Sequence, residues 1–252
     1  MTTSQRATPE RRAHARLRGA ARQAAYVDRN DRSLSALAEE FDAVLVFEDS
    51  RIRLVDRAGD IAFHPGLAFR RIERLAAGGI DPLVEIAGLR PGQNVLDGTL
   101  GLAQDALVAA FAVGPAGRVL GLEASAVLAV FVAEGLSECA LPGDPARVIT
   151  VEHGETAAWL ATTSSTFDVA VLDPMFATAK RAQHSLESVR HHARAEPVTD
   201  ELIVAAREKA ARVVVKLGDR AALSRLRHRP DRVRETRSTV WAAFAGCGSI
   251  GA

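Results

Sequence analysis

The sequence has few cysteines and few aromatic residues, and both shortages limit what the protein can be. Its two cysteines, Cys139 and Cys247, form neither a Cys-x-x-Cys pair nor a Cys/His metal spacing. The sequence therefore supports neither a disulfide framework nor a metal site, and a reducing, cytoplasmic setting is expected. Aromatic residues make up only 5% of the chain, so the core must consist mainly of Ala, Val, Leu and Ile.

Long hydrophobic runs are also missing. No apolar stretch approaches the roughly 20 residues that span a bilayer, and the N-terminal segment lacks the apolar core of a secretory signal. No membrane partner is therefore expected. The 252 residues are enough for one large α/β domain, or for such a domain with a small appendage.

Charge is distributed unevenly along the chain. Residues 1–32 carry a net charge of +5 and residues 204–252 a net charge of +7, so the middle of the chain is strongly acidic. Two interpretations remain open. Either both ends form a basic surface for a polyanion such as RNA, or they are ordinary solvent-exposed surface with a frayed terminal segment.

The N-terminal third predicts a small appendage. Residues 1–24 are Arg-rich and read as a disordered basic arm. A Ser-capped helix is expected over 33–41, and two short strand-like runs, AVLVFED and RIRLVD, follow it. A helix ending at Gly78-Gly79 and another beginning at Asp81-Pro82 come next. We expect an N-terminal appendage and a substrate-side helix over 25–80, and a ligand-binding domain over 81–252.

After residue 91, short apolar runs alternate with helical stretches of about 10–15 residues. This alternation predicts an α/β fold with a mostly parallel sheet covered by helices on both faces. The last two runs, VRETRS and TVWAAFAG, are expected to form an antiparallel pair.

The first strand of this pattern ends in a glycine-containing turn. Asp97, Gly98, Thr99 and Gly101 lie between the strand and the next helix. Ligands bind at the carboxyl ends of strands in such sheets, and glycines allow a close backbone approach. The turn lacks the GxGxxG spacing of dinucleotide sites and the Gly-Lys-Ser/Thr of a P-loop. An aspartate here would repel a phosphate but suits an amine or a sulfonium.

Further candidate residues end the second and third strands. Glu123 lies where an acid typically accepts two hydrogen bonds from a ribose diol. Acids at both strand ends favour an adenosyl ligand without a phosphate. After the third strand, His153, Gly154 and Glu155 are placed to border an adenine. The alternative is that Asp97 only caps a helix and Glu123 is a solvated loop acid.

The fourth strand ends in Asp173-Pro174-Met175-Phe176. This tetrapeptide looks like a variant of the Asn/Asp-Pro-Pro-Tyr/Phe loop of amine-directed methyltransferases. We expect the Asp173 carboxylate to accept hydrogens of an exocyclic base amine, Pro174 to fix the backbone and Phe176 to stack on the base. As an alternative, Asp-Pro is also an ordinary turn signal.

Taken together, the motifs VLDGTLGLAQDALVAAFAVG and VLDPMF and the strand end at Glu123 resemble the bacterial small-subunit rRNA guanine-N2 methyltransferases and their uncharacterised relatives. The resemblance covers roughly residues 25–245. It implies a Rossmann-like class I fold with a seven-stranded sheet, S-adenosylmethionine as cofactor, and RNA, either free or in a ribosomal subunit, as substrate. The cofactor contacts that it implies are Gln104, Asp105, Glu123, Ala124, Gly154, Glu155 and Asp173. This chain has Ala103-Gln104-Asp105 where the rRNA enzymes have Gly-Arg-Asp.

Some charged residues and some functions stay open. Arg70, Arg71 and Arg74 could hold a phosphate or a substrate, or simply solvate a helix face, and Lys216 at the end of the fifth strand could be structural. Two other functions compete with methyl transfer. One is a non-catalytic RNA- or partner-binding protein with a degenerate methyltransferase fold. The other is an NAD(P)-dependent oxidoreductase, which the missing GxGxxG disfavours.

Overall fold

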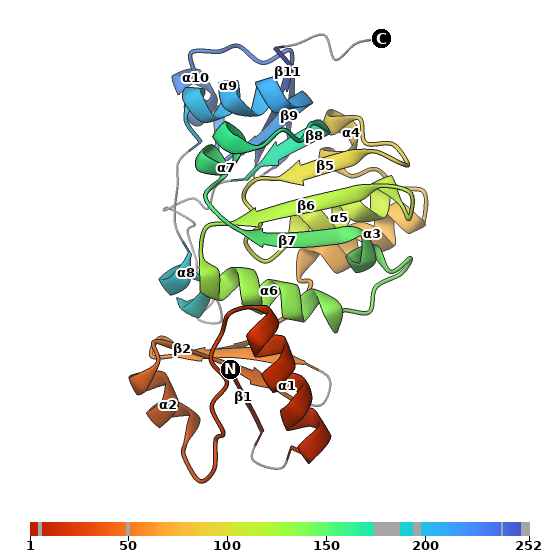
Figure 1. The fold of residues 1–252 in the computed structure, drawn as a ribbon. Coiled ribbons are helices and arrows are strands. Elements are labelled where there is room, and N and C mark those ends of the chain that lie inside the picture. The colour runs from red at the N-terminus through yellow and green to blue at the C-terminus, as the bar shows by residue number, and fades with distance from the viewer. Residues whose placement is uncertain (5–6, 49–50, 174–186, 194–197, 238, 248–252) are drawn as a thin grey trace. The chain divides into compact units, whose positions relative to one another are not determined.

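The computed structural model describes the chain except residues 5–6, 49–50, 174–186, 194–197, 238 and 248–252 (Figure 1). The chain divides into two compact units. The first unit comprises residues 1–64, 130–139 and 179–193, and the second comprises 65–129, 140–178 and 194–252. Each unit is described by itself below.

The second unit contains a seven-stranded sheet with the strand order β10-β11-β9-β8-β5-β6-β7. Strands β5 to β9 run parallel, whereas β11 is antiparallel to both β9 and β10. The strands are β5 (Asn94–Asp97), β6 (Arg118–Glu123), β7 (Ile149–His153), β8 (Phe167–Leu172), β9 (Ala210–Leu217), β10 (Arg232–Glu235) and β11 (Val240–Ala245). This confirms the mostly parallel sheet and the antiparallel pair at its end.

The strand order places one topological switch point in this sheet. From β5 the chain proceeds outward through β6 to β7, and it then returns to the other side of β5 with β8. Ligands of open α/β sheets bind outside the carboxyl ends of the strands at such a reversal. The loops that follow β5 and β8 are therefore expected to border a ligand-binding site.

Helices cover both faces of the sheet, as predicted (Figure 1). Helices α7 (Thr156–Thr162), α9 (Asp200–Lys209) and α10 (Arg220–Arg225) pack on one face, whose strand residues include Leu96, Leu172 and Val215. Helix α4 (Pro82–Ala87) packs on the other face. It contacts α5 (Gln104–Val113), which in turn contacts α3 (Leu67–Ala76). Two more elements follow β6, namely α6 (Ala126–Ser137) and the short 3-10 helix η1 (Pro145–Val148).

Local sequence signals explain where the helices begin and end. Asp81 caps α4 by accepting a hydrogen bond from the Leu83 N–H, with proline at the first turn, and Gly88 ends this helix in the left-handed conformation. Thr199 caps α9 in the same way. The predicted helix over 33–41 and the predicted helix start at Asp81-Pro82 are thereby confirmed, with helix ends shifted by one residue.

The first unit contains a four-stranded sheet of β1 (Thr2–Thr3), β2 (Ala43–Phe47), β3 (Ile52–Asp56) and β4 (Asp60–Ala62), in that order. Its helices are α1 (Pro9–Ala21), α2 (Leu34–Glu40) and α8 (Glu187–His192). The strand pair β2 and β3 was predicted, whereas β1, β4 and α8 were not. His192 of α8 lies 2.9 Å from the Asp56 carboxylate at the end of β3.

The N-terminal segment differs from the expected disordered arm. Thr8 caps α1 by accepting from the Arg11 N–H, and Pro9 begins the helix. Two of the arginines that suggested an unpaired basic arm, Arg18 and Arg22, form ion pairs with the buried carboxylate of Glu134. The partner acid is more than 110 residues away in the sequence, so composition alone could not reveal this pairing.

The expected boundary near residue 80 also differs from the observed division. The first unit ends at His64, and helix α3 belongs to the second unit. The reason is packing, because α3 buries Ala68 and Ile72 completely and contacts α5. Among the described residues, no helix has the length and apolarity to cross a bilayer, and no group of His, Cys, Asp or Glu could hold a metal ion.

Candidate active site

Alternation along the strands gathers three charged residues at one edge of the sheet. Leu96, Leu172 and Val215 face α7 and α9, so the next residue in each case, Asp97, Asp173 or Lys216, belongs to the opposite face. Strands β5, β8 and β9 are parallel neighbours, and their carboxyl ends therefore lie side by side. The carboxylates expected at the first and fourth strand ends are thus brought together by the fold.

The loop after β5 is held by its own backbone and by β8. Asp97 is buried, and its carboxyl oxygen accepts from the Thr99 N–H at 3.1 Å. The Gly98 N–H donates to the Val171 carbonyl, and the Asp173 N–H donates to the Thr99 hydroxyl. A Cβ at Gly98 would lie 2.8 Å from side-chain atoms of Leu172 and Thr156, so one of these side chains would have to shift to admit a larger residue.

Glu123 at the end of β6 organises two neighbouring loops. Its carboxylate oxygens accept from the Gly101 N–H at 3.0 Å and from the Ser125 N–H at 2.8 Å. Gly101 has a φ of 49°, which glycine adopts without strain. Burial raises the pKa of Glu123, and the two backbone hydrogen bonds and His153 oppose this rise. The carboxylate is therefore fixed in place, with one oxygen toward each loop.

The loop after β7 lies beside that of β6. The Gly154 N–H donates to the Glu123 carbonyl at 3.0 Å, and the His153 ring contacts the Ala124 carbonyl at 3.2 Å. A Cβ on Gly154 would meet no atom within 4 Å. Glu155 precedes α7 as its N-terminal cap residue. Open space beside this backbone is compatible with an adenine ring, which is flat and needs a close backbone edge.

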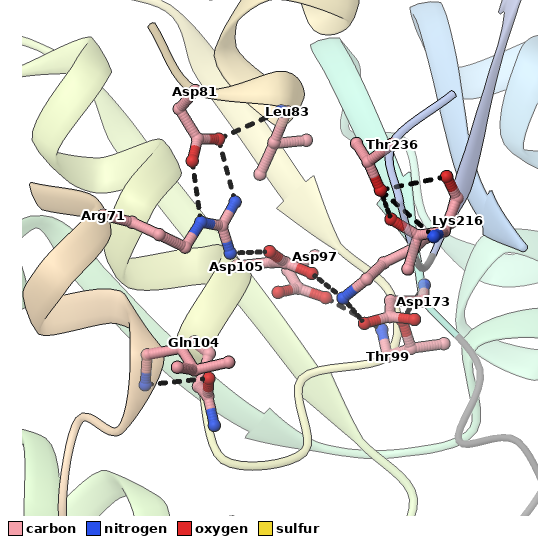
Figure 2. Close-up of polar contacts among 12 residues, drawn as sticks. Arg71, Asp81, Leu83, Asp97, Thr99, Gln104, Asp105, Asp173, Lys216 and Thr236 are labelled. Carbon is pink, nitrogen blue, oxygen red and sulfur yellow. Dashed lines mark hydrogen bonds and ion pairs between the residues drawn. The ribbon is translucent and has the colours of Figure 1, made fainter. Parts of the chain in front are cut away.

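The segment Ala103-Gln104-Asp105 starts α5. Ala103 is fully buried with a φ of 58°, an uncommon conformation for a residue with a side chain. The Gln104 side chain accepts from the Leu67 N–H at 3.2 Å, and it occupies the space where a side chain at Gly66 would be. Gln104 thus supports the loop before α3, while Asp105 points toward the strand ends (Figure 2).

A chain of ion pairs runs from α4 to the end of β8 (Figure 2). Arg71 donates to both oxygens of Asp81, at 2.8 and 2.9 Å, and to Asp105. Lys216 donates to Asp105 at 3.1 Å and to Asp173 at 2.5 Å. Both cations therefore share Asp105, and Asp173 lies at the end of the chain, where a quarter of its side chain is exposed.

Electrostatics divide these carboxyl groups into two kinds. Burial alone would raise the pKa of Asp105, but Lys216 and Arg71 outweigh it and hold that pKa below its usual value. Burial raises the pKa of Asp97 to about 8, and the nearby Asp105 and Asp173 carboxylates add to the rise. Burial raises the pKa of Asp173 to about 6, and the neighbouring Lys216 opposes this rise. Asp97 and Asp173 thus hold a proton more readily than an ordinary aspartate does, whereas Asp105 holds one less readily.

Carboxyl groups gather at the strand ends themselves. Asp97, Asp105 and Asp173 lie around the ammonium group of Lys216, whereas Arg71 and Arg74 both pair with Asp81 at the start of α4. A phosphate placed at these strand ends would meet carboxyl oxygens that repel it, whereas a positively charged group would be attracted to them. The donor set therefore fits a sulfonium cofactor such as S-adenosylmethionine and does not fit a pyrophosphate.

The rest of the predicted DPMF loop, Pro174, Met175 and Phe176, lies outside the described residues. Of the arginines considered on α3, Arg71 belongs to the ion-pair chain and Arg74 contacts Asp81 at 3.3 Å. The sequence pattern alone gave Arg71 and Lys216 little weight. The available signal for Lys216 was a cation directly after three consecutive valines in a strand.

The strand order, the helices on both faces and the carboxylates that end the first, second and fourth strands define a Rossmann-like class I methyltransferase fold. Residues 31–244 match the model of a protein family described as "Putative SAM-dependent methyltransferase". The chain belongs to this family of S-adenosylmethionine-dependent methyltransferases, and the family membership decides against the oxidoreductase alternative.

Two curated proteins are similar to the chain. It is 34% identical over 158 residues to the uncharacterized protein YpiP of Bacillus subtilis, a match that covers 60% of this chain and 62% of that protein. It is 31% identical over 202 residues to ribosomal RNA small subunit methyltransferase J of Hahella chejuensis, which covers 73% of each. The chain thus spans about three fifths of the first protein's length and about three quarters of the second's.

A solved structure shares the fold over nearly the whole chain. The crystal structure of an S-adenosylmethionine-dependent methyltransferase from Neisseria gonorrhoeae superposes with a TM-score of 0.66 at 21% identity. The match covers 98% of this chain and 96% of that one. Both units therefore have counterparts in a methyltransferase of known structure.

Proposed function

We propose that this protein transfers a methyl group from S-adenosylmethionine to an amine nitrogen, namely a guanine-type exocyclic amine in RNA. The observation that carries the proposal is Asp173, a partly exposed carboxyl group at the switch point of the sheet, paired with Lys216. The similarity to a ribosomal RNA methyltransferase supports RNA, and ribosomal RNA in particular, as the substrate class. A substrate of this kind would be met in the cytoplasm.

The cofactor is assigned to the loops at the carboxyl ends of β5, β6 and β7. Glu123 would hold the ribose hydroxyls, and the backbone at Gly154 would border the adenine. The remaining assigned contacts are Asp97, Gly98, Thr99, Gly101, Gln104, Asp105, Ala124, Glu155 and Asp173. S-adenosylmethionine supplies an electrophilic methyl group on a positively charged sulfur. The carboxyl groups of Asp105 and Asp173 at the strand ends would attract that sulfonium group.

Asp173 is assigned to the acceptor. The lone pair of an exocyclic base amine is delocalised into the ring, so the amine is a poor nucleophile. A carboxylate that accepts its hydrogens orients the nitrogen toward the methyl carbon, and positioning of this kind accounts for much of the rate in such displacements. Because the leaving sulfur becomes neutral, no strong base is needed, and the proton lost by the amine can pass to water.

Replacing Glu123 with glutamine should weaken S-adenosylmethionine binding by about tenfold or more. A glutamine amide would place N–H hydrogens against the Gly101 or Ser125 N–H, and it would remove the charged acceptor for the ribose diol. Isothermal titration calorimetry with the purified protein measures the affinity. Glu152→Gln, which changes the neighbouring strand where Glu152 accepts from Trp159, should stay within about twofold of the wild type. Equal affinities for the two variants would contradict the assignment.

The acceptor is best identified by mass spectrometry of nucleosides. Ribosomal RNA from cells with and without the gene is digested and compared, and a methylated guanosine should be missing from the deleted cells. The purified protein should restore it in RNA from those cells when S-adenosylmethionine is present. An unchanged nucleoside profile, together with no transfer to that RNA, would rule out an RNA base as the acceptor.

A further inference from the structure

Lys216 is a cation between apolar residues near the carboxyl end of its strand. Val213, Val214 and Val215 are fully buried and Leu217 is nearly so, and the Lys216 side chain itself is only 21% exposed. Burying an ammonium group is costly unless it is paired, and replacing a whole buried ion pair with well-packed apolar side chains is often neutral or stabilising. Stability alone therefore does not explain this lysine.

The ammonium group is held from three directions. It donates to Asp173 after β8 at 2.5 Å and to Asp105 of α5 at 3.1 Å, and it lies 5.2 Å from the ring centre of Trp241 on β11. Each contact comes from a different element of the second unit. Removal of any one would leave two, so the ammonium position is over-determined.

A second set of contacts fixes the position of Asp105. Arg71 of α3 contacts Asp105 on one side and both oxygens of Asp81 on the other, and Asp81 is itself fixed as the cap of α4. The charged and titratable groups that face Asp173 are thus Lys216, Asp105 and Asp97, with Arg71 behind Asp105. Only Lys216 in this group contacts Asp173 with a positive charge.

We propose that Lys216 is a positioning residue for methyl transfer. Its ammonium group fixes the Oδ2 atom of Asp173 and keeps this carboxylate ionised, while Asp105 and Arg71 hold the ammonium group in place. The inference rests on the proposed function, in which Asp173 accepts hydrogens of the acceptor amine. An ionised carboxylate accepts both hydrogens of an amine, whereas a protonated one would place its own hydrogen against them.

The expected size of the effect follows from the surrounding charges. An adjacent cation lowers the pKa of an aspartate by about 1–3 units, so removing Lys216 should raise the pKa of Asp173 by a similar amount from its present value of about 6. With a rise of about two units, the ionised fraction of Asp173 at pH 7 falls roughly tenfold. Activity should fall at neutral pH and recover as the pH is raised.

The first test is the pH dependence of kcat/KM for Lys216→Met, Lys216→Arg and a control, Lys209→Met. Lys209 ends α9 and donates to the Thr163 carbonyl at 2.7 Å, away from the strand ends that carry the site. We expect the acidic limb of the profile to move up by at least about one pH unit in Lys216→Met. It should return to within about half a unit of the wild type in Lys216→Arg and stay in place in the control. An activity loss that is equal at all pH values would show a merely structural lysine and overturn the proposal.

A second measurement does not require activity. Carbon-13 NMR follows the titration of the Asp173 carboxyl group, with Asp173→Asn to assign the signal and thermal melting to verify folding. The midpoint should lie near 6 in the wild type and at least about one unit higher in Lys216→Met. Identical midpoints would overturn the inference. If the midpoint shifts but the protein transfers no methyl group, the proposed function is overturned instead. The effect of Lys216 on the ionisation of Asp173 would then still be established.

Discussion

Replacing Asp173 with alanine should lower the rate of methyl transfer by at least about a hundredfold, the typical effect of deleting one oriented hydrogen-bonding group from an active site. The carboxyl group lies at the end of the strand next to the switch point, where Lys216 donates to it at 2.5 Å. Without it, the acceptor amine would lose the side-chain acceptor that orients its hydrogens. Single-turnover transfer of a radiolabelled methyl group to RNA from gene-deleted cells measures the rate.

A structural defect must be separated from a chemical one in this experiment. Lys216 keeps its contacts with Asp105 and Trp241 when Asp173 is removed, so the ion-pair chain is shortened but leaves no buried cation unpaired. The matched control is Asp168→Asn on the same strand. Asp168 accepts from the Asn94 N–H at the other end of the sheet, a role that an asparagine oxygen can also fill. We expect this control to keep wild-type activity. Full transfer by Asp173→Ala would mean that the methyl acceptor is oriented by other residues.

The sequence predicted those site residues whose positions follow from secondary structure alone. Once the chain after residue 91 is read as alternating strands and helices, parallel pairing must place the carboxyl ends of the strands at one edge. Asp97 and Glu123 end their strands and Asp173 directly follows its strand, so their placement at this edge needs no knowledge of side-chain packing. The helix caps Ser33 and Asp81 could be predicted for the same reason, because a cap is a local contact.

The ion-pair chain could not be predicted in this way. An arginine on a helix gives the same sequence pattern whether it meets solvent or a buried carboxylate. Arg71 contacts buried carboxylates because α3 packs against α5. Asp81, at the start of α4, and Asp105 of α5 then contact Arg71 from two different helices. The same reason applies to α1, whose Arg18 and Arg22 are paired through Glu134. Contacts between residues far apart in sequence decided both cases.

Replacing Asp97 with asparagine should remove a large part of the pH dependence of folding stability. In the folded protein, burial first, and then the Asp105 and Asp173 carboxylates, raise the pKa of Asp97 to about 8, compared with an ordinary value of 3.8. Between these two pH values the folded protein keeps a proton that the unfolded chain releases. The free energy of unfolding therefore decreases as pH rises from about 4 to about 8, by an amount on the order of a few kcal/mol.

Asparagine carries no titrating proton, and its side-chain oxygen can still accept from the Thr99 N–H. Urea unfolding of Asp97→Asn should therefore show a flatter dependence on pH, with the largest gain over the wild type near pH 8. Asp168→Asn should retain the wild-type slope. Parallel curves for Asp97→Asn and the wild type would mean that Asp97 is ionised in the folded protein throughout this range. A bound sulfonium would favour the ionised form of Asp97. We therefore expect Asp97 to destabilise the free protein at pH 8 and to strengthen cofactor binding.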